Sequence, residues 1–138
     1  MQRAAFVRVN RVVNIVVRRL GLRRFRGGDL LFLTTTGRRS GQSRTTPLLY
    51  LRRDADWVVA ASNGGADWEP GWWLNLRAGR PGIVEVAGRS VPVSGSEVTG
   101  TEREQLWREL NEHVFDYDGY QARVSRRIAV VVLAPVTA

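Results

Sequence analysis

The sequence predicts a mainly β domain of the α+β class, in which an antiparallel sheet closes toward a barrel and the helices are short. Six apolar or β-branched segments of strand length occur along the chain, several of them joined by turns of hairpin length. Only short helical segments lie between them. The 138 residues, 43% of them hydrophobic, suit one domain with a single core.

Composition removes several kinds of chemistry. The chain has no cysteine, which excludes disulfides, thiol catalysis and thiolate metal sites. One histidine, His113, argues against a histidine metal centre, so we predict no metal site. All 21 basic residues are arginines, which excludes Schiff-base chemistry and favours recognition of phosphate or carboxylate. The net charge of +8 predicts an acidic partner: an anionic small molecule, a lipid surface or nucleic acid.

Residues 1–26 stand apart from residues 27–138, because they hold eight arginines and no acidic residue. Helical spacing gathers their apolar side chains on one face and predicts a basic amphipathic helix. The segment is too short and too charged to span a bilayer and lacks a signal-peptide pattern, so we expect a cytoplasmic protein. Residues 4–20 either pack on the domain or make peripheral contact with anionic lipid on the inner face of the cell membrane.

The segment 30–51 predicts two strands joined by a glycine-bracketed loop. Gly37 and Gly41 allow the backbone to turn its N–H groups toward a ligand, and three arginines lie close by. We predict a phosphate-binding loop here, with a solvated basic hairpin tip as the alternative. The loop lacks the spacing of a nucleotide-binding P-loop. Its candidate binding residues are Arg38, Arg39, Ser40, Gly41 and Arg44.

The next segments predict a third strand and an aromatic helix. Residues 57–62 form the strand, paired with the second strand across a turn at 53–56 and ended by the sequence SNGG. Residues 68–78 contain Pro70 near a helix start and adjacent tryptophans, Trp72 and Trp73. Such indoles either stack on a flat ligand or belong to the core.

The last third of the chain predicts a hairpin, a helix and a final strand. Segments 83–86 and 89–98 form the hairpin, and a capping box at residues 101–104 opens the helix. His113 near the end of that helix is interpreted as a helix-dipole partner or a surface residue. Tyr117 and Tyr120 lie three residues apart, on the same side of a helical turn. The apolar run 128–133 predicts a central strand.

The sequence lacks the motifs of several catalytic classes. The order of residues suggests no Ser/His/Asp triad, and GxSxG and GxGxxG are absent. What remains is an anion-binding loop, a glycine-rich break after a strand, a tryptophan helix and a tyrosine pair. Together these features suit a flat, phosphorylated cofactor that brings its own reactivity.

Four segments, TTTGRRSGQSRTTPLLYL, VVAASNGG, EPGWWLNL and YDGYQARVSRRIAVVVL, resemble the deazaflavin-dependent nitroreductase family in order and spacing. The resemblance implies a split β-barrel related to FMN-binding oxidases, with coenzyme F420 as cofactor and FMN as the alternative. It further implies residues that hold the cofactor: Arg38, Arg39 and Arg44 on the phosphate and acidic tail, and Thr46, Pro47, Leu48, Ala61, Ser62, Asn63, Gly64, Gly65 and Trp72 along the ring and groove.

By the same resemblance, Trp73, Tyr117 and Tyr120 face the substrate, and Ser62 or a tyrosine polarises it or relays a proton. The implied activity is hydride transfer from reduced F420 to a hydrophobic, electron-poor acceptor: a quinone, an enone or a nitroaromatic. Two alternatives remain, a carrier of deazaflavin or lipid without turnover and an FMN-dependent oxidoreductase of the same fold. Nucleic-acid binding is disfavoured, because no recognised motif accompanies the charge.

Overall fold

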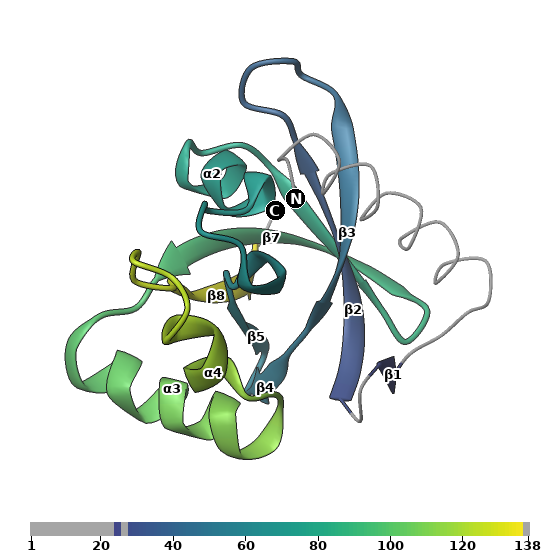
Figure 1. Ribbon diagram of the computed structural model, residues 1–138. Helices are drawn as coiled ribbons and strands as arrows, with labels where there is room; N and C mark the ends of the chain where they lie inside the picture. The colour runs from purple at the N-terminus through teal and green to yellow at the C-terminus, as the bar shows by residue number, and fades with distance from the viewer. Residues whose placement is uncertain (1–23, 26–27, 137–138) are drawn as a thin grey trace.

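The structure, a computed structural model, describes residues 24–25 and 28–136 and consists of an antiparallel sheet with short helices on two sides (Figure 1). Its elements in chain order are β1 (Arg24–Phe25), β2 (Gly28–Thr36), β3 (Ser43–Leu49), β4 (Leu51–Arg53), β5 (Asp56–Ala60), η1 (Asn63–Gly65), α2 (Gly71–Arg77), β6 (Gly82–Val86), β7 (Arg89–Glu97), α3 (Gly100–His113), α4 (Tyr117–Gln121) and β8 (Val130–Pro135). No helix in this part of the chain is long and apolar enough to cross a membrane.

The sheet closes on itself through the β3–β4 segment. The strand order is β1-β2-β6-β7-β8-β5-β4. Strand β3 lies off this path and pairs with β2. Only Tyr50 separates β3 from β4, yet β3 pairs with β2 and β4 pairs with β5. One nearly continuous run therefore joins both sides of the sheet, which confirms the predicted antiparallel barrel.

The strand count differs from the six strands predicted from the sequence. In the described residues the second predicted strand is two strands, because the chain changes pairing partner at Tyr50. Arg24 and Phe25, which we had grouped with the N-terminal helix, already pair with β2 as β1. The rest of that predicted helix lies outside the described residues. β5 ends at Ala60, two residues before the predicted end of the third strand.

Alternating side chains of the sheet build two apolar clusters. On β5, Trp57 and Val59 point into the barrel interior, whereas Val58 and Ala60 point to the opposite side. The interior cluster is closed by Trp72, Trp73 and Leu76 of α2. The second cluster is covered by α3 and α4, which lie at the other end of the molecule from the β2–β3 hairpin (Figure 1).

Two glycines allow α2 to sit directly on the sheet. A Cβ at Gly82 or Gly95 would lie 2.9 Å or 2.8 Å from side-chain atoms of Leu76. Pro70 occupies the N-cap position of α2, as the sequence predicted. The close packing fixes the height of α2 above β6 and β7, and with it the position of every side chain that α2 presents to the hairpin.

The predicted capping box at residues 101–104 is wrong. The helix α3 begins at Gly100, and the N-cap residue Thr99 makes no side-chain capping bond. Glu102 instead pairs with Arg53 of β4, at 3.0 Å. Arg103 is 7% exposed and donates from Nη1 to the carbonyl of Ile128 at 2.7 Å. This helix is oriented by side chains that reach the sheet rather than by its own first turn.

Candidate active site

The loop between β2 and β3 is closed by three of its own backbone N–H groups. Gly37 N donates to the carbonyl of Gln42 at 2.8 Å, and Gly41 N donates to the carbonyl of Gly37 at 3.0 Å. Gln42 N donates to Ser40 Oγ at 3.2 Å. The N–H groups of Gly37, Gly41 and Gln42 thus bond within the loop, and donation of backbone N–H groups to a ligand stays a prediction for Arg39 and Ser40. The glycines serve the tight closure of the loop, since a Cβ at Gly37 would lie 2.5 Å from Ser40 Oγ.

Arg38 is held from the opposite side by Asn75 of α2. The backbone N and the Nη1 of Arg38 donate to Asn75 Oδ1 at 3.1 Å and 3.2 Å. Asn75 Nδ2 donates in turn to Thr35 Oγ1 at 3.0 Å. Arg80 Nη2 reaches the carbonyl oxygen of Arg38 at 3.4 Å. No local sequence pattern links Asn75 or Arg80 to the loop, because both lie about forty residues downstream.

The pairing of β2 with β3 sorts the candidate residues by face. Arg44, Thr46 and Leu48 lie opposite three buried residues of β2, Thr35, Leu33 and Leu31. Cross-strand partners point to the same side, so these three project toward the barrel interior and α2. Arg44 is exposed there, and Thr46 and Leu48 are half-buried. Pro47 projects to the outer face beside Phe32, whereas Arg39, Ser40 and Gly41 form the exposed tip of the loop.

The break after β5 forms a second part of the site. Asn63, Gly64 and Gly65 have φ values of 52°, 64° and 86°, the left-handed region that glycine favours. Asn63 Nδ2 donates to the carbonyl of Trp68 at 3.0 Å. Ser62 is half-buried and Ala61 is buried. This segment leads through residues 66–70 directly into α2.

Arg126 fixes this segment from the C-terminal part of the chain. Its Nη1 donates to the carbonyl of Ala61 at 3.0 Å, and its Nη2 donates to those of Ser62 and Ala66 at 3.1 Å and 3.0 Å. Burial lowers the pKa of Arg126, an effect opposed by nearby carboxylates. The one signal for this arginine in the sequence is its place in the last of the four family-like segments.

The aromatic residues divide into buried and accessible rings. Tyr120 is half-buried and packs over Gly65, where a Cβ would lie 3.1 Å from the ring. Tyr117 is 4% exposed, with Phe115 and Trp107 at ring-centroid distances of 5.5 Å and 6.3 Å. Burial, and to a lesser degree Tyr120, raises the pKa of Tyr117 well above its usual value.

Two residues expected to face a substrate are thus core residues in this structure. Trp73 is 2% exposed inside the barrel, and Tyr117 belongs to the cluster beneath α3. Trp72, expected along the cofactor, is 6% exposed. The physical reason is packing: α2 and α4 are short and turn their large rings toward the sheet. Of the three residues predicted to face a substrate, only Tyr120 keeps substantial accessible surface.

The candidate site follows α2, which is about 10 Å long for its seven residues. Its C-terminal end meets the arginine loop through Asn75, and its N-terminal end follows η1 and Ser62. The α2-facing side of β3 carries Arg44, Thr46 and a half-buried leucine. Cationic groups at one end and apolar and hydroxyl surface at the other fit an anionic arm joined to a flat ring.

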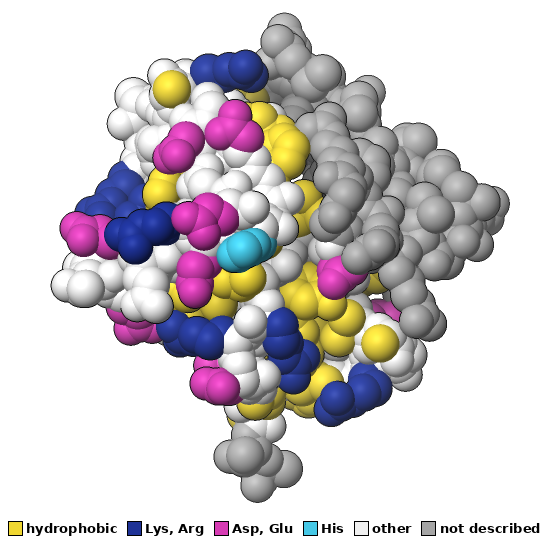
Figure 2. Space-filling model, turned by 90° about the horizontal axis from the view of Figure 1, so that it is seen from below, with side chains coloured by type: hydrophobic (Ala, Val, Ile, Leu, Met, Phe, Trp, Pro, Cys, Tyr) yellow, Lys and Arg dark blue, Asp and Glu magenta, His cyan; other side chains and the backbone are white. Residues whose placement is uncertain are grey.

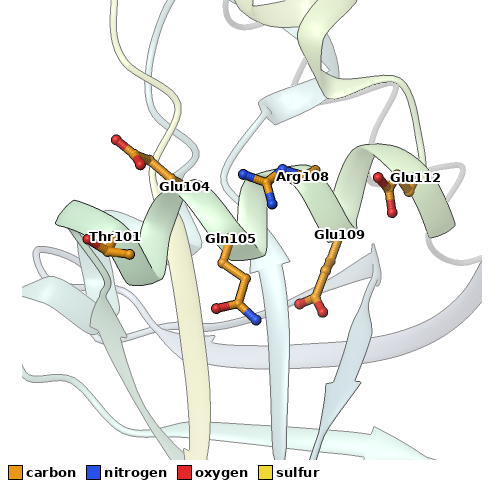
Figure 3. A pocket seen from close by; sticks show the side chains of 6 residues that line it. All are labelled: Thr101, Glu104, Gln105, Arg108, Glu109 and Glu112. Carbon is orange, nitrogen blue, oxygen red and sulfur yellow. The ribbon is translucent and has the colours of Figure 1, made fainter.

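The exposed face of α3 holds a separate hollow. It is lined by Thr101, Glu104, Gln105, Arg108, Glu109 and Glu112, all from this one helix (Figure 3). His113 is 65% exposed and lies 3.7 Å from the carboxylate of Glu112. Figure 2 shows the histidine at the surface with acidic side chains beside it, in keeping with the predicted surface residue. Most of these side chains are exposed, and none of them belongs to the site along α2.

The closed sheet places the chain in the split β-barrel class of oxidoreductases. The profile of the F420H(2)-dependent quinone reductase family matches residues 7–135. The chain therefore belongs to the F420H(2)-dependent quinone reductase family. This membership confirms the predicted fold and the predicted class of F420H2-dependent reductase.

Individual relatives agree with the family assignment. The chain is 38% identical over 106 residues to an F420H(2)-dependent quinone reductase of Mycobacterium tuberculosis (strain H37Rv). The matched region covers 75% of this chain and 71% of the relative. A solved F420-H2 dependent reductase shares the fold with a TM-score of 0.67 and 30% identity, over 75% of this chain and 92% of that one. A second solved structure, described as a domain-swapped dimer, has a TM-score of 0.69 and 26% identity, over 96% and 99% of the two chains.

Proposed function

We propose that this protein binds reduced F420 along α2 and uses it to reduce a quinone. The observation that carries the proposal is the geometry of Arg38 and Arg44. Both lie at the end of the hairpin that faces α2, and Arg38 is oriented there by a buried amide. Exposed Arg39 and Arg80 add positive charge around the same loop. Guanidinium groups so arranged suit the phosphate and carboxylates of the F420 arm.

The ring of the cofactor is proposed to lie against Thr46 and Leu48 on one side and the segment 61–65 on the other. The left-handed backbone of this segment is held by Arg126, so its shape is fixed before a ligand arrives. Such preorganisation reduces the entropy lost on binding. When bound, F420H2 supplies a hydride from carbon 5, which together with one proton converts a quinone to a hydroquinone.

Ser62 and Tyr120 are the residues proposed to act on the acceptor. Ser62 is half-buried and its side chain makes no capping bond to η1, so its hydroxyl is available to donate to an acceptor oxygen. The ring of Tyr120 covers Gly65 and provides an apolar wall with a hydroxyl at its edge. Tyr117 is proposed to support Tyr120 through Phe115 rather than to touch the substrate. Enones and nitroaromatics share the electron-poor character of quinones and are proposed as further acceptors.

Cofactor titration is the first test. Purified protein is titrated with F420 and, separately, with FMN, while the intrinsic tryptophan fluorescence is recorded. We expect tighter binding of F420, and tighter binding of FMN would replace the cofactor assignment. Oxidation of F420H2 is then followed with menadione, an enone and a nitroarene. Loss of reduced cofactor that depends on the acceptor supports the reductase, and its absence with every acceptor supports a carrier.

Variants of the loop test the anion site directly. Arg38→Ala and Arg44→Ala are each expected to weaken F420 binding by about 1 to 3 kcal/mol, the scale of a charge-assisted contact. Arg89→Ala is the matched control, because Arg89 is exposed at the start of β7, far along the sheet from the hairpin. Unchanged affinity in both loop variants would contradict the proposed site.

The basic segment 4–20 lies outside the described residues, and its role is a further part of the proposal. We propose a cytoplasmic protein whose arginine-rich segment makes peripheral contact with anionic lipid. Sedimentation with anionic and with neutral vesicles tests this, using a variant in which Arg8, Arg11, Arg18 and Arg19 are replaced by Gln. Equal sedimentation of the two proteins would favour packing of the segment on the domain. Filter binding of nucleic acid at two salt concentrations tests nucleic acid as the alternative partner of this segment.

A further inference from the structure

We propose that Asn75 is a positioning residue that orients Arg38 for the anionic arm of the cofactor without neutralising its charge. The inference rests on the proposed function, since it assumes that Arg38 meets an anion. It adds a residue of α2 to the hairpin residues that are proposed to bind the anion. Its role would be to act through Arg38 rather than on the ligand.

Both polar atoms of the Asn75 side chain are hydrogen-bonded within the protein. Its Oδ1 accepts from the backbone N of Arg38 at 3.1 Å and from Arg38 Nη1 at 3.2 Å. Its Nδ2 donates to Thr35 Oγ1 at 3.0 Å. Asn75 is 5% exposed and Thr35 is 2% exposed. A buried amide with these partners has a single orientation, so it fixes both the backbone and the guanidinium of Arg38.

The chemical type of the residue matters as much as its position. A neutral amide oxygen takes one of the five N–H groups of the guanidinium and leaves the others for a ligand. A carboxylate at the same position would form an ion pair and cancel the positive charge. The structure therefore combines a fixed orientation with a cation that no carboxylate of the described residues neutralises, which is the combination that an anion site requires.

The surroundings of Asn75 explain why α2 can supply this group. Leu76, the next residue, packs on Gly82 and Gly95, which brings the C-terminal end of α2 close to the sheet. Arg80 follows the helix and contacts the carbonyl of Arg38 at 3.4 Å. Arg38 is thus held at its amide and its guanidinium from α2, and at its carbonyl from Arg80 beyond the helix.

The decisive variant is Asn75→Asp, which keeps the size of the side chain. A carboxylate can accept both bonds from Arg38, and the hydroxyl of Thr35 can rotate to donate to it. We expect the melting temperature to stay close to that of the wild type. The dissociation constant of F420, from quenching of tryptophan fluorescence, should rise by about tenfold or more, as for the loss of one charge-assisted contact. Wild-type affinity in a folded Asn75→Asp protein would overturn the inference.

A double-mutant cycle separates positioning from general stability. If Asn75 acts through Arg38, Asn75→Ala should weaken F420 binding in the wild type but change it less than about twofold in the Arg38→Ala protein. In the Arg39→Ala protein, which lacks a different arginine, its effect should remain at full size. A full effect of Asn75→Ala in the Arg38→Ala protein would contradict the inference. It would indicate that the asparagine supports the site only by stabilising the fold.

The experiment also distinguishes this inference from the proposed function. A wild-type protein that does not bind F420 would remove the proposed function. Inorganic phosphate then decides the role of Asn75 alone. Phosphate should raise the melting temperature of the wild type more than that of Asn75→Asp, because only the former leaves Arg38 unpaired. Equal shifts in the two proteins would overturn the inference as well.

Discussion

Gly65 is the residue at which the backbone of the candidate site meets an aromatic side chain. Its φ is 86°, and an added Cβ would lie 3.1 Å from the ring of Tyr120. Gly79 has φ 82° with nothing within 4 Å of such a Cβ. The two glycines therefore share a left-handed backbone but differ in their neighbours.

Replacing each glycine by alanine separates these two effects. Both Gly65→Ala and Gly79→Ala are expected to lower the free energy of unfolding by about 1 kcal/mol, the cost of the left-handed backbone. Only Gly65→Ala should also change the KM for menadione, because its methyl group displaces Tyr120. Urea unfolding and steady-state kinetics measure the two quantities. Equal kinetics in the two variants would show that the position of Tyr120 does not affect the acceptor.

Tyr117 gives the protein a predictable response to alkaline pH. Burial raises its pKa in the folded state, whereas in the unfolded chain the pKa is about 10. The stabilisation by the protonated hydroxyl is complete below pH ~10 and is lost as the pH rises further, since only the unfolded chain releases the proton. Tyr117→Phe should therefore flatten the decline of stability above pH ~10, measured by urea unfolding at successive pH values. A residual slope is expected from Tyr50, whose pKa burial also raises.

At the scale of single residues, the sequence located the arginines but not what holds them. Arg38 and Arg44 stand in a loop whose glycines and flanking strands are local signals. Asn75 and Arg126 act through contacts across 37 and 65 residues of chain, which only the closed barrel creates. The two adjacent tryptophans of α2 show the same limit. Their number predicted an aromatic helix, but their burial depends on how that helix meets the sheet.

At the scale of elements, α3 shows how tertiary contacts replace a local signal. The sequence TERE has the pattern of a capping box with Thr101 as N-cap, yet the N-cap is Thr99, two residues earlier, and Glu102 pairs with Arg53. The buried Arg103 makes the shortest polar contact of this region to the sheet, at 2.7 Å, and its guanidinium lies 5.1 Å from the ring centre of Trp107. We infer that the helix is held by Arg103 and its apolar face.

Substitutions in the first turn of α3 test this inference. Thr101→Ala and Glu104→Ala should each change the free energy of unfolding by less than about 0.5 kcal/mol, because both side chains are exposed and neither caps the helix. Arg103→Met should cost about 2 kcal/mol or more, since the carbonyl of Ile128 loses its buried donor. Urea unfolding of the three variants measures these differences. A loss near 1 kcal/mol for Thr101→Ala would restore the capping box.

Elements with strong local patterns were predicted well, and changes of pairing were not. The hairpin about Ala87 and Gly88, the turn at Asp54 and the start of α2 after Pro70 all appear in the structure. Turn residues and proline act within a few positions, so their effect is visible in the sequence. The division at Tyr50 has no such signal, because it arises where one run of chain leaves β2 and joins β5.

At the scale of the whole molecule, the closed sheet joins the two apolar clusters. β5 and β8 contribute alternate residues to both clusters, so neither cluster can lose its packing without disturbing the same two strands. Most of the candidate site lies on the α2 side, α3 lies on the other, and Tyr120 of α4 reaches the site at Gly65. We infer that the barrel transmits a loss of packing on either side to the whole domain, which predicts a single cooperative unfolding transition.

Adjacent valines on β5 provide a matched test of this coupling. Val58 and Val59 are both fully buried, but Val58 faces α3 and Val59 faces the barrel interior. Each substitution by alanine should cost about 2 kcal/mol, as expected for two buried methyl groups. In both variants the transitions by far-UV circular dichroism and by fluorescence should coincide. Trp68 and Trp107 are replaced by Phe for this test, so that the remaining indoles, Trp57, Trp72 and Trp73, report the barrel interior. If Val58→Ala instead moved only the circular dichroism transition, the helices would unfold apart from the barrel, and the site along α2 would be independent of α3.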